Sequence, residues 1–149
     1  MAYPLTHRQY YEGLKAGKLL GLKCGKCGAI TAPPKINCLQ CNGADLEVVE
    51  LSGQAEIKTF TVVRVPPEGM TAPYVVALAE LAEGPWLMGN LEVADPGAVT
   101  MDIIGRKVTV GHKVVPADLY SAGEGVAVTF SICGSPPPSG REAVKKMIC

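Results

Sequence analysis

The sequence predicts a mainly β protein, in which an N-terminal helix and a small four-cysteine ribbon precede a β-barrel. The chain has 149 residues, and its 17 Gly and 12 Pro are typical of many short strands joined by turns. Four of its six cysteines form two Cys-x-x-Cys pairs, and a series of strand-like segments follows them. This length suits one ordinary domain, or a small domain joined to a tiny one.

The first segment, residues 1–21, is predicted to be a helical arm. Thr6 can cap the helix, and Gln9 three residues later completes a capping-box pattern. Tyr10 and Leu14 then share one face, because they are four residues apart. A helix of about three turns is marginal alone, so we expect it to dock on its own domain or on a partner.

Residues 22–45 are predicted to form a zinc ribbon. A gap of two residues lets two thiolates reach one tetrahedral ion, and glycine or Asn-Gly follows each pair, where a tight turn needs a positive φ. A redox Cys-x-x-Cys pair, incidental buried cysteines and a rubredoxin-type iron site are the alternatives. With all four positions filled by protein, the zinc would be structural and would stabilise a segment too short to build a core. The predicted ligands are Cys24, Cys27, Cys38 and Cys41.

Residues 46–134 are predicted to form an OB-fold barrel, with an SH3-like barrel as the second choice. Five or six strands with one short helical interruption suit this class. A Pro-rich linker and C-terminal tail, residues 135–149, complete the chain. The expected strands are residues 46–51, 54–65, 74–81, 86–93, 107–115 and 126–132.

Charge is balanced over the whole chain but unevenly placed. Residues 1–43 hold six basic residues against one acidic residue, and residues 44–134 hold five basic against twelve acidic. The shift near residue 43 supports a module boundary there. An acidic barrel with few aromatic residues argues against nucleic-acid binding through the barrel face, which needs a positive groove and stacking platforms.

No catalytic set is recognisable in the sequence. The two histidines, His7 and His112, fall in different modules, and Cys133 has the setting of a small packed hydrophobe. Phosphate-binding and hydrolase motifs do not occur either. No apolar segment resembles a signal peptide or a membrane span, so we expect a soluble cytoplasmic protein without catalytic residues of its own.

An ordered series of motifs resembles the family of OB-fold acyl-CoA-associated proteins with an N-terminal rubredoxin-like zinc ribbon. The resemblance covers about residues 6–132 and extends beyond the cysteines. It rests on the initial helix, Cys24-x-x-Cys27-Gly28, Pro33-Pro34, Cys38-x-x-Cys41, Ser52-Gly53, Thr59-Phe60-Thr61, Pro73-Tyr74, Glu80-Leu81 and Ile104-Gly105-x-x-Val108.

This resemblance implies an accessory subunit of a thiolase-type acyltransferase or hydroxymethylglutaryl-CoA synthase complex. The thiolase-fold partner would carry the catalytic residues, and the ribbon–OB subunit would support binding of the CoA ester. The pathway stays open, bacterial degradation of aromatic acids among the possibilities, and a free-standing binding module for nucleic acid or CoA esters is the alternative. The candidates for the CoA phosphates are Lys18, Lys23, Lys26, Lys35 and Arg64.

Overall fold

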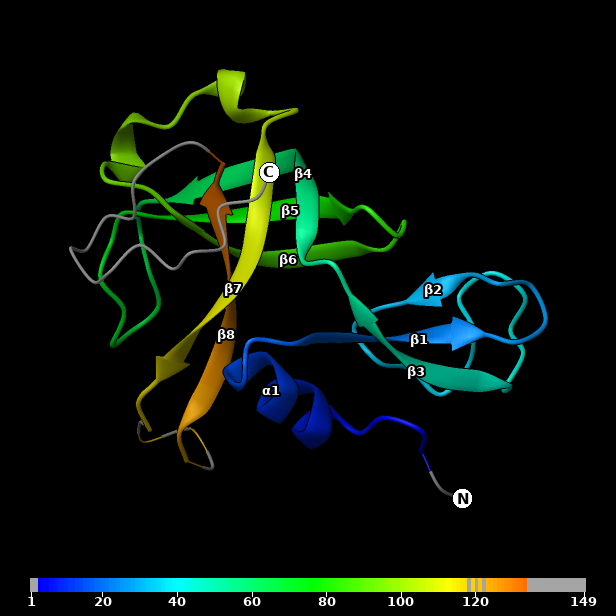
Figure 1. Cartoon of the computed structure of the whole chain (residues 1–149). Helices are drawn as coiled ribbons and strands as arrows, with labels where there is room; N and C mark the ends of the chain where they lie inside the picture. The colour runs from blue at the N-terminus through cyan, green and yellow to red at the C-terminus, as the bar shows by residue number, and fades with distance from the viewer. Residues whose placement is uncertain (1–2, 118, 120, 122, 134–149) are drawn as a thin grey trace.

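The chain folds into a three-stranded ribbon sheet and a five-stranded closed barrel, joined by a short link and bridged by a helix (Figure 1). The structure is a computed structural model that describes residues 3–117, 119, 121 and 123–133. The predicted tail, residues 135–149, lies outside the described residues. Within the described part of the chain, no helix has the length and apolar character of a membrane span.

Helix α1 (His7–Lys15) begins at the predicted capping box. The Gln9 backbone N–H donates to Thr6 Oγ1 at 3.2 Å, and the Thr6 N–H donates to Gln9 Oε1 at 2.9 Å. Tyr10 and Leu14 are buried, which confirms the predicted face. Below the barrel in Figure 1, α1 packs on β1 of the ribbon and on β7 and β8 of the barrel.

The ribbon sheet has the order β2-β1-β3, with β1 (Leu19–Cys24) between β2 (Ile30–Thr31) and β3 (Leu46–Leu51). The assignment of residues 46–51 to the barrel was wrong, because β3 pairs antiparallel with β1 along its whole length, from Leu19↔Leu51 to Cys24↔Leu46. The two-residue strand β2 pairs only with the C-terminal part of β1. The other edge of β1 is covered along its whole length by β3, which follows the second cysteine pair.

The barrel closes in the order β4-β5-β6-β8-β7, with β4 pairing with both β5 and β7. Strands β6 and β8 run parallel, and every other neighbouring pair is antiparallel. This order and mixed pairing define an OB-type barrel, as predicted. Its strands are β4 (Gln54–Val63), β5 (Tyr74–Leu81), β6 (Trp86–Glu92), β7 (Lys107–Val115) and β8 (Gly125–Ile132).

The barrel core follows the alternation of its strands. On β5, Val75, Ala77, Ala79 and Leu81 are buried and their neighbours face outward. Between β6 and β7, two 3₁₀ turns, η1 (Pro96–Ala98) and η2 (Met101–Ile103), form the expected helical interruption, and η2 buries Ile103. The small side chains of Ala77 and Ala79 on β5 leave room in the barrel core for large side chains of other strands.

Candidate metal centre and its surroundings

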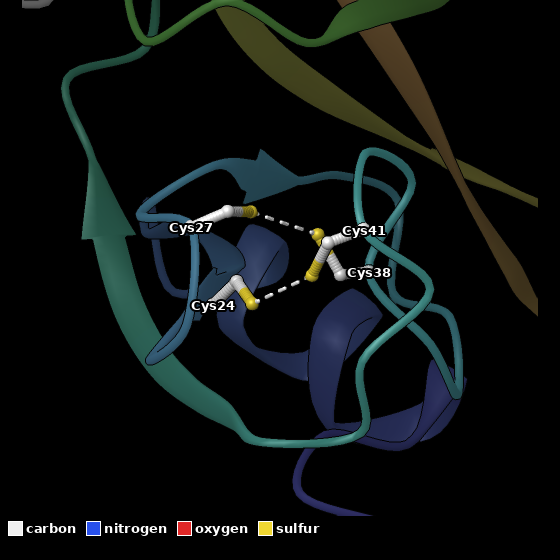
Figure 2. A group of neighbouring side chains, drawn as sticks. All are labelled: Cys24, Cys27, Cys38 and Cys41. Carbon is white, nitrogen blue, oxygen red and sulfur yellow. Dashed lines mark hydrogen bonds between the residues drawn. The ribbon is translucent and has the colours of Figure 1, made fainter.

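Four cysteine side chains from two loops point toward one another in the ribbon (Figure 2). Their sulfur atoms all lie within 4.8 Å of one another. The Cys24–Cys41 and Cys27–Cys38 sulfur pairs are each 3.5 Å apart. Two sulfurs bound to one zinc at about 2.3 Å in tetrahedral geometry would lie about 3.8 Å apart. The spacing of the cluster therefore fits a single four-coordinate ion.

Two tight turns hold the cysteine pairs, with the backbone conformations predicted from the sequence. Gly28 has a φ of 75° and Asn42 a φ of 58°, each directly after the second cysteine of its pair. The Gly28 N–H donates to the Cys24 carbonyl at 3.0 Å, and the Asn42 N–H donates to the Cys38 carbonyl at 3.0 Å. The two knuckles are thus built alike, although their sequences differ.

A buried threonine supports the second knuckle. Thr31 on β2 is 0% exposed, and its Oγ1 accepts the Leu39 backbone N–H at 3.4 Å. Leu39 directly follows Cys38, so this contact links the small strand β2 to the turn that carries the second pair. Sequence reasoning missed Thr31, because a single threonine in a strand gives no sign of its partner.

Backbone N–H groups favour the thiolate form of two of the cysteines. The pKa of Cys24 is lowered to about 6, first by the backbone N–H of Cys27 and then by that of Lys26. The backbone N–H groups of Cys41 and Gln40 lower the pKa of Cys38 in the same way. The pKa of Cys27 is raised instead, to about 11, because the backbone N–H of Ala29, which lowers it, is outweighed by hydrogen bonds with the neighbouring cysteine sulfurs, first that of Cys38, and by burial. Thiolates are the metal-binding form of cysteine, so the two turns favour a cation at Cys24 and Cys38.

The backbone also approaches the cluster too closely for larger residues. A Cβ atom placed on Gly43 would lie 3.2 Å from Cys41 Sγ and 3.4 Å from Lys26 Cδ. A Cβ atom on Gly25 would collide with the Asp45 carboxylate. Four sulfur donors that converge on one point fit a structural metal, because they fill all four positions of a tetrahedral ion and leave none for a substrate.

The five basic candidates do not form one site. Lys23 lies on β1 directly opposite Glu47 of β3. Lys26 passes beside Gly43 at the cysteine cluster, and Lys18 and Lys35 are exposed on ribbon loops. Arg64 follows the far end of β4, and its Nη2 donates to the Gly97 carbonyl at 3.2 Å. The structure therefore groups the four lysines with the ribbon and separates Arg64 from them.

Two grooves lie on the described surface, and none of the five basic candidates lines either of them. One, of about 300 Å³, runs over β4, β5 and β7 beside the Glu56–Lys58–Glu80 ion pairs of 3.4 and 3.2 Å. The other, of about 340 Å³, lies between α1, the link at Ser52–Gly53 and β7, and includes the exposed His112. Three distant segments build the second groove, so no local pattern could predict it.

The ribbon with four convergent cysteines and the OB-type barrel define the class of protein: a zinc-ribbon/OB-fold chain. Comparison with known families agrees. Residues 12–47 match the family described as "ChsH2, rubredoxin-like zinc ribbon domain", and residues 48–114 match "ChsH2, C-terminal OB-fold domain". The chain belongs to this DUF35 family of ribbon–OB proteins.

Relatives with assigned names include both scaffold proteins and enzyme subunits. The chain is 35% identical to a "DUF35 domain-containing scaffold protein" of Methanocaldococcus jannaschii over 67% of this chain and 71% of that protein. It is 33% identical to "Benzoylsuccinyl-CoA thiolase subunit BbsA" of Thauera aromatica, over 59% of this chain and 60% of the relative. It is 35% identical to a "Probable enoyl-CoA hydratase alpha subunit" of Thermomonospora curvata, over 71% of this chain but only 31% of the longer relative.

A solved structure described as "Ltp2-ChsH2(DUF35) aldolase" has the same arrangement. The two superpose with a TM-score of 0.63 at 29% identity, covering 83% of this chain and 91% of the other. The predicted family and fold are thereby confirmed.

Proposed function

We propose that this chain is a non-catalytic subunit of a cytoplasmic enzyme complex that acts on CoA esters, with a thiolase-type acyltransferase as its partner. The observation that carries the proposal is the similarity of this ribbon–OB chain to relatives named as a thiolase subunit and as an enoyl-CoA hydratase subunit. Thiolytic cleavage or formation of a 3-oxoacyl-CoA is the reaction we assign to the complex. The partner would supply the nucleophile and the acid–base groups.

We infer that the ion of the ribbon is Zn²⁺ with a structural role. Cys24, Cys27, Cys38 and Cys41 would hold it as thiolates, and their sulfur spacing supports this assignment. The ion would supply the cross-link that keeps β1, β2 and the second knuckle together, since Cys24 and Cys38 are the only buried residues of the two cysteine turns. Four thiolates and one zinc together carry a charge of −2, which the ribbon lysines partly offset.

We also propose that the ribbon lysines bind the phosphates of CoA at the boundary with the partner. Lys26 and Lys35 are exposed and face no acidic residue across a strand, whereas Lys23 lies opposite Glu47. Lys18 is the third exposed candidate, and Arg64 would act only if the ligand reached the far end of the barrel. Holding the CoA end would position the acyl group without contributing to the chemistry.

The first test is affinity purification of the chain from its native cytoplasm at low salt, with mass spectrometry and sizing of the complex. A stoichiometric thiolase-fold protein is the expected result. Adding back the chain should then restore activity or stability that the isolated partner lacks. A partner that is fully active and stable alone would contradict the proposal.

A second measurement addresses the lysines. Changing Lys26 and Lys35 together to Glu should raise the KM of the complex for CoA, and the matched change Lys113→Glu on β7 should not. If the KM is unchanged, the chain is a scaffold without ligand contact. A salt-sensitive shift of oligonucleotides by the free chain would instead favour the nucleic-acid alternative.

A further inference from the structure

One outer face of the barrel exposes large apolar side chains in an ordered arrangement. Strands β5 and β6 alternate, so that Leu78 lies opposite Met88 and Glu80 lies opposite Trp86 on the outward side. Trp86 is 50% exposed and Met88 is 64% exposed. We call this surface the β5–β6 face; its outward residues are Tyr74, Val76, Leu78, Glu80, Trp86, Met88, Asn90 and Glu92.

The loop before β5 extends the exposed apolar surface. The Tyr74 hydroxyl lies 3.8 Å from Met70 Sδ, which holds the loop against the start of the strand, and Met70 is itself 48% exposed. Scattered single apolar residues are normal on a protein surface, but a tryptophan and methionines together are typical of protein interfaces.

The strands of this face and the loops that flank them contribute charge of one sign. Residues 65–105, which include β5, β6 and the loops that flank them, contain six acidic residues and no lysine, arginine or histidine. Two basic residues lie beside the face. The Nζ of Lys58 on β4 is occupied by Glu80 at 3.2 Å and Glu56 at 3.4 Å, and Arg64, just after β4, donates to the Gly97 carbonyl at 3.2 Å. The remaining acids include Glu92 at the end of β6 and the exposed Asp95 just beyond it.

The exposed apolar side chains and the acidic residues together favour one kind of binding partner. An OB barrel can stack nucleic-acid bases on an outward aromatic such as Trp86, but such sites track the phosphates with positive charge, which residues 65–105 lack. The phosphates of CoA are disfavoured here for the same reason. A protein surface with apolar side chains at its centre and lysine or arginine at its edge complements the face.

We propose that the β5–β6 face is the surface on which the catalytic subunit docks, with apolar residues of that subunit against Trp86 and Met88 and basic residues near Glu92 and Asp95. This assignment rests on the proposed function, since it names the occupant as the CoA-ester enzyme. It places the partner on the barrel face and leaves the ribbon lysines to the ligand.

The test uses the purified chain and the purified enzyme that co-elutes with it. Met88→Asp puts a charge in the centre of the face and should weaken binding by about tenfold or more, as for a central interface residue. Val114→Asp is the matched control, because Val114 is also an exposed strand residue, at 44%, but lies on β7. Binding of the control should stay within about twofold of the parent chain. Glu92→Lys should slow association and reduce its dependence on salt.

A fluorine label on Trp86 reports directly on binding at the β5–β6 face. Trp86 is the only tryptophan of the chain, so 5-fluorotryptophan gives a single ¹⁹F resonance from the centre of the proposed interface. Its shift should change when the unlabelled enzyme is added, and circular dichroism should show that Met88→Asp remains folded. Trp86→Ser, which leaves the barrel interior intact, is a second variant with the same expected loss of binding.

Each outcome decides the proposal. If Met88→Asp binds the enzyme as tightly as the parent chain does, the docking face is wrong while the proposed function stands. If the parent chain binds no CoA-ester enzyme, both the function and the occupant are wrong. If the parent chain forms dimers that Met88→Asp separates, the face serves a second copy of this chain and the proposal is overturned.

Discussion

The buried cysteines of the ribbon are residues whose replacement should remove the metal. Cys38 is 3% exposed, and its sulfur accepts the Gln40 backbone N–H at 3.4 Å. Cys38→Ser should reduce bound zinc from one ion per chain to almost none, because three thiolates and a poor oxygen donor cannot close the site. Elemental analysis of the purified variant measures this directly.

Leu39 provides the matched control, since it lies in the same knuckle but is 57% exposed. Leu39→Ser should keep the full metal content. Retention of zinc by Cys38→Ser would show that the cluster does not act as a four-sulfur site.

The hydroxyl of Tyr10 should make stability depend on pH in alkaline solution. Tyr10 is 1% exposed, and its hydroxyl has no hydrogen-bond partner among the described residues. Burial, with a smaller contribution from the neighbouring Tyr11, raises the pKa of Tyr10 to about 12. The folded chain therefore holds this proton more tightly than the unfolded chain, whose tyrosine pKa is about 10. The contribution of protonated Tyr10 to the free energy of unfolding is complete below about pH 10 and is lost as the pH rises toward 12.

Tyr10→Phe should remove this pH dependence, which amounts to about 2 kcal/mol across the interval. At neutral pH the variant should be as stable as the parent chain to within about 1 kcal/mol, because the lost hydroxyl has no partner. Urea unfolding at a series of pH values gives both quantities. Tyr11→Phe is the control, since Tyr11 is 39% exposed. Parallel pH profiles for the parent chain and Tyr10→Phe would refute the assignment of the pH dependence to Tyr10.

At the scale of the elements, a single glycine lets β6 approach β8. A Cβ atom on Gly89 would lie 2.8 Å from Val128 Cγ1 and 2.9 Å from the Val128 carbonyl oxygen. Gly89→Ala should therefore lower the free energy of unfolding by roughly 1–3 kcal/mol, the usual cost of overpacking. Gly125→Ala, also in the barrel but with open space around it, should change stability by less than about 1 kcal/mol. Equal stability of the two variants in chemical unfolding would mean that the barrel tolerates the added methyl group.

The positions of the strands in the sequence were easier to predict than the strands with which they pair. The apolar, strand-forming run from Tyr74 to Leu81 identified β5 as a strand, and the structure shows that Val75 faces the core while Val76 faces outward. The same kind of pattern identified β3 as a strand but could not show that it pairs with β1, since a strand of six residues carries no sign of its neighbour. Pairing depends on which edge is left open when the chain returns, and that is decided by the whole sheet.

The metal cluster was predictable, and the surfaces were not. Cys-x-x-Cys spacing and the residues after each pair determine the local turn, so Gly28 and Asn42 could be assigned a positive φ in advance. The placement of Arg64 far from the ribbon, and of Trp86 outward on β6, depends on how the barrel closes. Residues brought together by tertiary structure leave no local pattern to recognise.

At the scale of the molecule, α1 is the element that joins the two modules. It packs on β1 on one side and on β7 and β8 on the other, and Lys15 contacts Glu124 at 3.0 Å. The direct link between the two modules is short and is held by two hydrogen bonds. The Ser52 N–H donates to Glu83 Oε1 at 2.8 Å, and the Val110 N–H donates to the Gly53 carbonyl at 2.7 Å. The barrel sheet closes without any strand of the ribbon, although the buried residues of both modules form one continuous core.

Removal of the metal should therefore unfold the ribbon while the barrel stays folded. In the two cysteine turns, residues 24–28 and 38–43, only Cys24 and Cys38 are buried. Structural zinc contributes about 10–16 kcal/mol of apparent binding energy in comparable small sites. The barrel holds no ligand of the cluster, so its closed sheet and buried residues such as Val75 and Phe130 should survive chelation. Hydrogen–deuterium exchange of the chain, with and without a zinc chelator, should show loss of protection in residues 19–31 and 38–51 and retained protection in β5, β6 and β8. Restoring zinc should restore the ribbon. Simultaneous loss of protection in both modules would instead show that α1 couples them into one cooperative unit, in which the metal stabilises the entire chain.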